Sequence, residues 1–286
     1  MKNIACVIVN YNDSKRTINL ASTICSYASI NEIIIVDNCS SDNSYSSLVD
    51  LKHEKIHLYK SPRNGGYGYG NNYGALKAKE LGADYILIAN PDVTFNNECV
   101  AHMAQSMEKK SIYAVVGAKE VKMGVFAYKY TSLLDDILSA SLFFNKLLKK
   151  RYYARAFFEN KKYAEVDIIP GCLLLVDLSK FFEIGGYDES VFLYEEEKIL
   201  YCRLKNKYKS LVDLEVEYNH NHEESHQYTV RSALTGKKRL LASKYYFLKK
   251  YRRANVFTLF LAKIFFKLTI IEMLVWILVR NNMRPK

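Results

Sequence analysis

Apolar runs of strand length alternate with helical patterns along the first 118 residues of the chain. Continuous apolar strands that alternate with helices predict a doubly wound, mostly parallel α/β sheet with both faces covered. The predicted strands are Ile4–Val9, Glu32–Asn38, Ile56–Tyr59, Tyr85–Ala89 and Tyr113–Ala118. The predicted helices are Ser14–Ala28, Ser44–His53, Tyr73–Leu81 and Glu98–Lys110. Right-handed connections bring the carboxyl ends of such strands to one edge of the sheet, where ligands bind.

The strand Tyr85–Ala89 ends abruptly in Asn90, Pro91 and Asp92. Pro91 cannot donate to a sheet ladder, so the strand stops there and leaves the Asp92 carboxylate at the ligand-binding edge. The second strand, Glu32–Asn38, also carries a carboxylate near its carboxyl end, that of Asp37. A tripeptide of this kind is also a common turn, so its meaning depends on the rest of the chain.

Beyond residue 118 the patterns are less regular. They predict an amphipathic helix over Leu133–Lys150, extended chain over Val166–Val176, a short helix over Ser179–Ile184 and a strand over Leu211–Tyr218. Another helix is expected to begin at the acidic triplet Glu195–Glu197.

Three further stretches carry residue types that are used in chemistry. The glycine-rich stretch Asn64–Gly70 allows close approach to a phosphate or sugar, although it is also an ordinary flexible turn and lacks the Lys-Ser/Thr of a phosphate-binding loop. Crowded carboxylates raise one another's pKa, so Glu195–Glu197 is either a general-base site or a charged helix face. His220, His222 and His226 form either a polar loop or a source of metal ligands. One Asp and one His with diphosphate oxygens suit Mg²⁺ or Mn²⁺.

The composition limits the classes of partner and compartment. The 286 residues allow one large or two ordinary domains, and a formal net charge of +11 favours an anionic partner such as nucleic acid, a membrane surface or a phosphorylated ligand. The six cysteines are scattered and sit partly in apolar runs, which is typical of reduced thiols in a cytosolic protein. The first apolar run is too short for the core of a signal peptide.

Several of these stretches together resemble the inverting glycosyltransferases of family 2, which have a GT-A fold, and in pattern the bacterial rhamnosyltransferases of cell-surface polysaccharide synthesis. The matching stretches run in order from about residue 3 to residue 226. They are Val9–Asn12, Val36–Asn38 with Ser40–Asp42, Asn64–Gly68 with Asn71–Gly74, Asn90–Asp92, Gly185–Glu189, Phe192–Tyr194 with Glu196 and Glu197, and His220 with Ser225.

The resemblance implies a role for each matched residue. The implied donor-binding residues are Asn10, Tyr11, Asp37, Asn64, Gly65, Gly68, Asn72, Asn90 and Asp92. Asp92 also takes the metal-binding place of the family's D-x-D motif, with His220 as the later metal or diphosphate contact and His222 as its rival. Glu197 is the implied general base, and its neighbour Glu196 is the alternative. Asp188, Tyr194 and His222 are expected on the acceptor side.

Two positions depart from the family pattern. Glu197 stands where the family usually has Asp, and Ile199 replaces an acidic residue. The implied reaction is a single displacement, in which the base deprotonates an acceptor hydroxyl that attacks the anomeric carbon and inverts it. The expected donor is dTDP-rhamnose. UDP-galactose, UDP-GlcNAc and UDP-galactofuranose are alternatives, as is a non-catalytic sugar-nucleotide-binding subunit of a polysaccharide assembly complex. A nucleotidyltransferase would need a Lys/Arg-rich triphosphate loop near the amino terminus, which the sequence does not show.

The carboxyl-terminal segment combines apolar and basic residues. Val256–Val279 is long enough to span a membrane, but Lys263, Lys267 and Glu272 interrupt it and a very basic stretch precedes it. We therefore expect a helix that lies on the cytoplasmic face of the cell membrane, with packing on the catalytic domain or in a homodimer as the alternative. A polyprenyl-diphosphate-linked or glycan acceptor fits this location, and no nucleic-acid-binding motif is visible.

The predicted domain organisation follows from these assignments. Residues 1–230 form a GT-A catalytic domain, with a nucleotide-sugar half (1–118) and an acceptor half (119–230). Residues 231–286 form a helical segment for membrane association or dimerisation.

Overall fold

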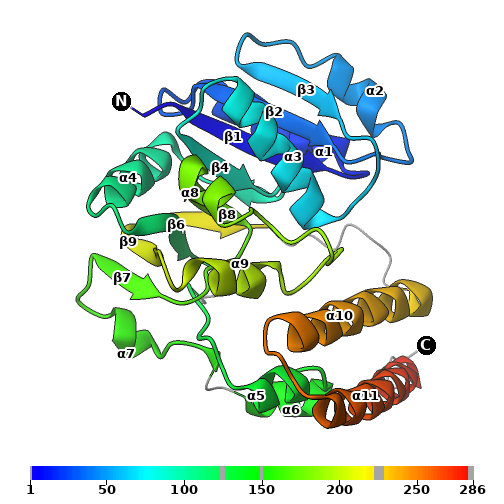
Figure 1. Cartoon of the computed structure of the whole chain (residues 1–286). Coiled ribbons are helices and arrows are strands. Elements are labelled where there is room, and N and C mark those ends of the chain that lie inside the picture. Colours follow the sequence, from blue (N-terminus) through cyan, green and yellow to red (C-terminus); the bar gives the residue numbers. More distant parts are fainter. Residues whose placement is uncertain (1, 123–125, 149–150, 222–228, 283–286) are drawn as a thin grey trace.

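The computed structural model describes residues 2–122, 126–148, 151–221 and 229–282. Within them, nine strands form a sheet in the order β3-β2-β1-β4-β8-β6-β9-β5, with β7 paired to β9 (Figure 1). The strands are β1 (Ile4–Asn10), β2 (Glu32–Asp37), β3 (Ile56–Lys60), β4 (Tyr85–Ala89), β5 (Val93–Thr94), β6 (Tyr113–Glu120), β7 (Tyr163–Val166), β8 (Leu173–Asp177) and β9 (Lys209–His220). The predicted α/β architecture is confirmed.

The two halves of the sheet differ in strand direction. In the first half β1 pairs parallel with β2 and β4, and β2 with β3, as the alternating pattern predicts. In the second half β8 lies between β4 and β6 and is antiparallel to both. The strand β9 is parallel to β6 but antiparallel to β5 and β7. The sheet is therefore mixed, and its parallel part is the part whose carboxyl edge carries Asp37 and Asn90–Asp92.

Helices cover both faces of this sheet and build a layer beside it. They are α1 (Ser14–Ile24), α2 (Ser44–Val49), α3 (Tyr67–Glu80), α4 (Asn97–Glu108), α5 (Leu133–Leu138), α6 (Leu142–Leu147), α7 (Arg155–Phe158), α8 (Leu178–Glu183), α9 (Glu196–Leu204), α10 (Val230–Lys250) and α11 (Val256–Asn282).

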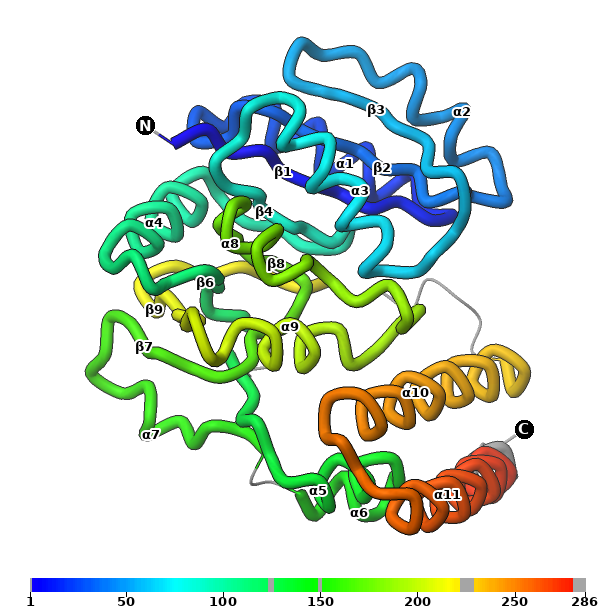
Figure 2. The backbone as a smooth tube through the Cα atoms, in the orientation of Figure 1, coloured from blue at the N-terminus to red at the C-terminus, as the bar shows by residue number. Residues whose placement is uncertain are grey.

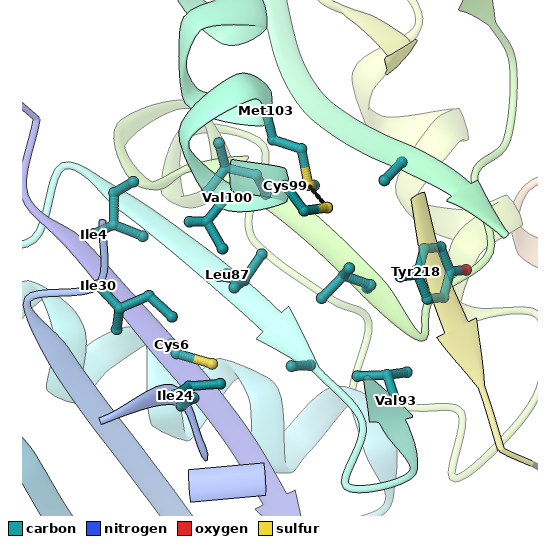
Figure 3. Close-up of a cluster of buried hydrophobic side chains, with 14 of the residues drawn as sticks. Ile4, Cys6, Ile24, Ile30, Leu87, Val93, Cys99, Val100, Met103 and Tyr218 are labelled. Carbon is teal, nitrogen blue, oxygen red and sulfur yellow. Dashed lines mark hydrogen bonds between the residues drawn. The ribbon is translucent and has the colours of Figure 1, made fainter. Parts of the chain in front are cut away.

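Alternate residues of the strands build two cores, one on each face. On one face, Cys6, Ile33 and Leu87 pack with side chains of α1, α2 and α4. Figure 3 shows part of this cluster, in which the Cys99 thiol contacts the Met103 sulfur at 3.8 Å. On the other face, β1, β2 and β4 pack with α3, α8 and α9. Burial on both sides explains why these strands are apolar throughout.

Several predicted boundaries are wrong. The helices α1 and α2 end at Ile24 and Val49, four residues before the predicted ends, and β6 continues to Glu120, two residues beyond its predicted end. There are four further differences. Helix α3 begins at Tyr67, six residues before the predicted start, because the glycine-rich stretch is largely its first turns. The predicted helix Leu133–Lys150 is split into α5 and α6, since Ser141 caps a new helix by accepting from Phe144 N. The predicted extended stretch Val166–Val176 consists of the end of β7, a turn and β8. Strand β9 continues to His220, beyond the predicted end at Tyr218.

The carboxyl-terminal helices α10 and α11 lie side by side and contact α5 and α6 (Figure 1). They place the carboxyl terminus at the opposite end of the molecule from the amino terminus (Figure 2). The Glu272 carboxylate of α11 accepts hydrogen bonds from Ser141 Oγ and from the backbone N–H groups of Leu142 and Phe143, so it caps α6. None of the helices among the described residues is long and apolar enough to cross a membrane.

Candidate active site

The carboxyl edge of β1 and β2 is built around Asp37. This carboxylate is fully buried and accepts hydrogen bonds from Asn10 Nδ2 at 2.9 Å and from Ser40 Oγ at 2.6 Å. The strand register pairs Asn10 with Asp37 directly. Asp37 therefore fixes the loop that follows β2, while the neighbouring Tyr11 is 46% exposed at the same edge.

The glycine-rich stretch is used for close helix packing. A Cβ on Gly66 would lie 1.9 Å from the Phe192 carbonyl oxygen, one on Gly70 would lie 2.7 Å from Val9 Cγ1, and one on Gly74 would lie 2.3 Å from Val7 Cγ1. Gly70 and Gly74 are spaced by four residues and share one face of α3. Gly66 directly precedes the helix and has φ +91°, a conformation that favours glycine. Asn64 accepts from Asn38 Nδ2 at 3.2 Å and so connects the start of α3 to β2.

Gly65, Gly68 and Asn72 serve contacts within the protein. A Cβ on Gly65 would meet the Tyr69 ring at 2.4 Å, and one on Gly68 would meet Tyr187 Cβ at 2.9 Å. The Asn72 amide donates to the Tyr187 carbonyl at 3.0 Å and accepts from its N–H at 2.9 Å.

Asp92 and His220 meet at the same edge, although 128 residues separate them in the sequence. Strand β5 pairs antiparallel with the end of β9, with Val93 opposite His220. This register holds Asp92 Oδ1 3.2 Å from His220 Nε2. Burial alone would lower the pKa of His220, but the Asp92 carboxylate and the Cys172 thiol raise that pKa to about 10. With this raised pKa the imidazole is protonated at neutral pH and forms an ion pair with Asp92. A divalent cation bound here would have to replace the imidazolium proton, after which the carboxylate oxygen and the imidazole nitrogen would form a donor pair suited to the ion.

A cavity of about 620 Å³ lies beside this pair and is lined by Asn90, Tyr194, Glu196, Glu197 and His220. Other walls come from the α5–α6 region and from α10, through Lys129, Asp136, Asn145, Arg151 and Lys244. The fold thus brings together the strand end Asn90, the acidic triplet and His220, which the sequence patterns singled out separately.

The three glutamates at the start of α9 have different environments. Burial would raise the pKa of Glu195, but Lys198 and Lys244, each 2.9 Å away, lower it to about 2 and keep this carboxylate ionised. Burial and the negative charge of Glu197 raise the pKa of Glu196. Burial also raises the pKa of Glu197, against the hydrogen bond that its Oε1 accepts from Gly171 N at 3.1 Å.

Exposure distinguishes the two glutamates with raised pKa values. Glu196 is 4% exposed, and its Oε1 has no hydrogen-bond partner among the described residues. Glu197 is half-buried. A carboxylate with a raised pKa beside a cavity suits a general base near neutral pH, and Glu197 is the more accessible of the two.

The backbone before these glutamates is strained. Tyr194 has φ +76° and Glu195 has φ +69°, a conformation that side chains other than glycine rarely adopt. Helix α9 begins directly after this turn. The buried ion pairs of Glu195 with Lys198 and Lys244 hold the strained turn in place, and backbone strain of this kind is typical of functional sites.

Of the residues expected on the acceptor side, Tyr194 lines the cavity and Asp188 does not. Tyr194 lines it and is 39% exposed. Asp188 is buried elsewhere and accepts hydrogen bonds from Tyr246, Lys250 and Tyr251, so it anchors the end of α10. His222 lies outside the described residues.

Several residues at the cavity were not found from the sequence. Asp136 pairs with Lys198 at 2.9 Å and with Arg252 at 2.6 Å, which joins α5, α9 and the end of α10. Lys244 also donates to Ser139 Oγ of the same layer, at 2.8 Å. The sequence offered one indication of these basic residues, the abundance of Lys and Arg after residue 230. That abundance does not indicate which of the cations are buried at the cavity.

Another set of possible ligands lies away from this cavity. Among the described residues, one group of three or more such side chains has all its ligand atoms within 4.8 Å of one another, namely His102, Asp213 and Glu215. The Asp213 carboxylate already accepts from Ser106 Oγ at 2.7 Å, and Glu215 pairs with Lys162 at 2.8 Å. These contacts give the group a structural role on α4 and β9.

Comparison with known proteins identifies the family. The profile described as glycosyl transferase family 2 matches residues 5–175, more than half of the chain. The chain belongs to glycosyltransferase family 2. The expected family and its GT-A fold are therefore both confirmed.

The relatives of this family 2 glycosyltransferase include two curated proteins. One is the low-salt glycan biosynthesis hexosyltransferase Agl10 of Haloferax volcanii, 27% identical over 203 residues, which cover 71% of this chain and 61% of that protein. The other is the rhamnosyltransferase WbbL of Escherichia coli K12, 27% identical over 150 residues, which cover 49% of this chain and 54% of that protein. The chain thus spans less than two thirds of the length of either relative.

A solved structure shares the fold of this family 2 glycosyltransferase. The mannosyltransferase PcManGT of Pyrobaculum calidifontis, in complex with GDP-Man and Mn²⁺, superposes with a TM-score of 0.59. The match covers 89% of this chain and 65% of that protein, at 14% sequence identity.

Proposed function

We propose that this protein is a metal-dependent, inverting transferase that moves rhamnose from dTDP-rhamnose to a lipid-linked glycan acceptor in bacterial surface polysaccharide synthesis. The observation that carries the proposal is one cavity lined by Asn90, His220 and the Glu196–Glu197 pair, with Asp92 3.2 Å from His220. In the proposed displacement the metal-binding pair would stabilise the leaving group, and the carboxylate with a raised pKa would act as the general base.

The donor nucleotide would bind along the carboxyl edge of β1, β2 and β4. Asp37 holds the wall of this site through Asn10 and Ser40, and the exposed Tyr11 offers a ring to the nucleotide. The start of α3, from Asn64 to Asn72, closes the site from the side, with Gly65 and Gly68 allowing the close packing. The similarity to a rhamnosyltransferase supports rhamnose as the sugar, as does Asn90, which stands where a second carboxylate is usual.

Asp92 and His220 would hold the metal, Mg²⁺ or Mn²⁺. Their donor atoms fit either ion, and PcManGT binds Mn²⁺ with a nucleotide sugar on the same fold. The bound ion would supply positive charge to the diphosphate leaving group. Asn90 would donate hydrogen bonds to the ribose or diphosphate.

Glu197 would accept the proton of the acceptor hydroxyl as that oxygen attacks the anomeric carbon. Its raised pKa keeps the carboxylate basic, and the Gly171 N–H orients it from the neighbouring wall. Glu196 would act on the reaction only through the electrostatic environment of Glu197. Tyr194 would contact the acceptor at the mouth of the cavity.

The acceptor would be delivered at the cytoplasmic face of the cell membrane. Large apolar side chains are exposed along the whole outer face of α11, with Lys263 and Lys267 exposed among them. Such a surface suits an anionic bilayer interface. Residues 1–230 would then form the catalytic domain, with its donor half 1–118 and acceptor half 119–230. Residues 231–286 would form the membrane-binding segment.

A panel of nucleotide sugars tests this proposal. The purified protein is incubated with dTDP-rhamnose, UDP-galactose, UDP-GlcNAc, UDP-galactofuranose and GDP-mannose, each with Mn²⁺, with Mg²⁺ and with EDTA, and slow donor hydrolysis is measured. We expect hydrolysis of dTDP-rhamnose above the others, and only with metal. Preferential use of another donor would overturn the rhamnose assignment, and equal rates in EDTA would overturn the metal.

A further inference from the structure

The wall of the cavity formed by α6 and its neighbours carries two basic residues that have no role in the displacement. Lys129 and Arg151 both line the cavity there. Arg151 Nη1 donates to Asn145 Oδ1 at 2.6 Å, and its Nη2 donates to the Tyr152 hydroxyl. These bonds hold the guanidinium against α6, because Asn145 belongs to that helix.

These two cations differ from the other basic residues of the cavity. Lys198 and Lys244 are ion-paired with Glu195, and Lys198 also with Asp136. By contrast, no carboxylate of the described chain lies within ion-pair distance of Lys129 or Arg151. Lys129 Nζ lies 5.3 Å from the centre of the Tyr153 ring, and Arg151 Nε has no hydrogen-bond acceptor among the described residues.

A pair of basic side chains without carboxylate partners beside a cavity indicates an anionic ligand. Guanidinium groups bind phosphate oxygens through two parallel hydrogen bonds, and the ammonium of Lys129 adds a second positive charge. The carboxylates of Asp136 and Glu195 do not oppose such a ligand strongly, since the two are paired with three cations, namely Lys198, Lys244 and Arg252.

An exposed apolar surface continues from the helix that holds Arg151. On α6, Phe143 and Leu147 are each 63% exposed. Helix α11 packs beside α6, with the Phe144 and Phe265 rings 6.1 Å apart, and it extends the apolar surface. The exposed apolar side chains of α11 are Val256, Phe257, Phe260, Leu261, Ile264, Leu268, Ile271, Val275, Trp276, Leu278 and Val279. Phe143 and Leu147 are each two residues from Asn145, so they lie on the opposite face of α6 from the residue that holds Arg151. A phosphate bound at Arg151 would therefore lie across this short helix from a surface suited to a hydrocarbon chain.

We propose that Arg151 and Lys129 bind the phosphate groups of a prenyl-diphosphate acceptor, whose hydrocarbon chain lies on the apolar surface of α6 and α11. This proposal rests on the proposed function and adds to it the residues that recognise the acceptor. It also explains why the cavity is walled by α5, α6 and α10 as well as by the sheet: the reacting sugar is held between the donor edge and the carrier phosphates.

Direct binding of three probes tests the proposal with the full-length protein in EDTA and without donor. Farnesyl diphosphate carries both parts of the ligand, inorganic diphosphate carries the anion alone, and farnesol carries the hydrocarbon alone. Calorimetry gives the affinity. The emission of Trp276, the one tryptophan of the chain, reports on the α11 surface, where its side chain is 45% exposed.

We expect farnesyl diphosphate to bind roughly tenfold or more tightly than either fragment and to shift the Trp276 emission to shorter wavelength. Arg151→Gln combined with Lys129→Gln should weaken that binding about 10- to 100-fold. Arg151→Lys, which keeps a positive charge, should recover part of the affinity if the variant is folded. Lys161→Gln, which removes an exposed cation over the Phe157 ring, is the matched control and should bind like the parent.

Three results would overturn the proposal: equal affinity of parent and double variant for farnesyl diphosphate, equal affinity of the parent for farnesol, or equal affinity for inorganic diphosphate. The last result would assign the site to a free diphosphate. Because these measurements contain neither metal nor donor, they stand apart from the nucleotide-sugar panel. If the parent protein binds farnesyl diphosphate but hydrolyses no donor, the proposed function is overturned and this inference stands. If the parent hydrolyses a donor but does not bind farnesyl diphosphate, this inference is overturned and the proposed function stands.

Discussion

At the scale of single residues, the chemistry depends on how the protein separates three adjacent carboxylates. Two lysines keep Glu195 ionised, whereas burial raises the pKa of both Glu196 and Glu197. Adjacent residues of one helix point in different directions, so a run of three like charges can serve three purposes. The sequence shows the run of three glutamates. Only the positions of Lys198, Lys244 and Gly171 show which glutamate stays ionised and which has a raised pKa.

The first prediction concerns the pH dependence of the reaction. A base with a raised pKa must lose its proton before it can act, so kcat should rise with pH through a midpoint above the usual glutamate value of about 4.3. Burial and the charge of Glu197 raise the pKa of Glu196, so Glu196 stays protonated while Glu197 titrates, and Glu196→Gln should leave that midpoint nearly unchanged while transfer persists. Initial rates between pH 4.5 and 9 measure this. If Glu196→Gln abolished transfer, and Glu197→Gln stayed active with a shifted midpoint in its pH profile, Glu196 would be the base and Glu197 its neighbour.

The second prediction concerns the metal ligands. His220→Ala should weaken Mn²⁺ binding about 10- to 100-fold, because an imidazole ligand is lost. Electron paramagnetic resonance of free Mn²⁺ in a titration measures the affinity without any reaction. The control is His102→Ala, which removes the imidazole of the other group of possible ligands. A larger loss in His102→Ala than in His220→Ala would move the metal to that group.

At the scale of secondary-structure elements, α10 supports the start of α9. Lys244 of α10 pairs with Glu195 within the strained turn, and Arg252, just after α10, pairs with Asp136 of α5. The carboxyl-terminal helices are therefore part of the structure that presents Glu196 and Glu197.

The third prediction tests this support with Lys244→Met. Removing one of the two cations that pair with the buried Glu195 carboxylate leaves its negative charge less well neutralised. This should lower the free energy of unfolding by about 3–5 kcal/mol. The pKa of Glu195 is lowered to about 2 in the folded state, so its contribution to stability is present above about pH 4.5 and is lost as pH falls toward 2. In Lys244→Met the pKa of Glu195 should rise, so the acid loss should begin at higher pH. Urea unfolding at pH 3, 5 and 7 measures both effects.

The exposed neighbour Lys249 supplies the control for this experiment, because Lys249→Met removes a charge from the same helix outside the buried network. It should change the free energy of unfolding by less than about 1 kcal/mol. Equal stability of Lys244→Met and the parent at pH 7 would contradict the supporting role of α10.

Local pattern predicted most elements of the first half of the fold and few details of the second. Strands such as Ile4–Asn10 and Tyr85–Ala89 are apolar because both their faces are buried, and that property is visible in short windows of sequence. The start of α3 was missed because glycine favours turns, whereas here Gly70 and Gly74 permit close packing against Val9 and Val7. The split between α5 and α6 depends on Glu272, more than a hundred residues away.

At the scale of the whole molecule, the site residues that were predicted are those in contiguous motifs. Asp92 and His220 meet only because β5 pairs with β9. The resemblance to a family implied that the two residues share a site, but no pattern in the sequence predicted this strand pairing. The cations of the cavity wall come from segments with no motif, and their burial depends on tertiary contacts. The sequence indicated a basic, apolar carboxyl terminus but not that its helices complete the cavity.

The fourth prediction is that the protein floats with anionic liposomes through the outer face of α11. Deletion from Ala254 should abolish flotation, but it also uncovers Leu241 and Leu248. The decisive variant is therefore Phe260→Ser with Ile264→Ser, which changes exposed positions only and should reduce the floating fraction severalfold. Ile112→Ser with Val121→Ser removes two exposed apolar side chains elsewhere and should float like the parent. Unchanged flotation of the α11 variant would assign this face to another partner, such as a second copy of the chain.

The fifth prediction concerns the central claim that one cavity holds both the metal-binding group and the base. The most direct measurement is the rate of dTDP-rhamnose turnover with Mn²⁺ by the parent, Asp92→Ala and Glu197→Gln. Glu197→Gln should lower kcat about 10²- to 10⁴-fold with little change in donor affinity, and Asp92→Ala should weaken donor binding as well. If both variants turn over the donor at the rate of the parent, the reaction does not take place at this site.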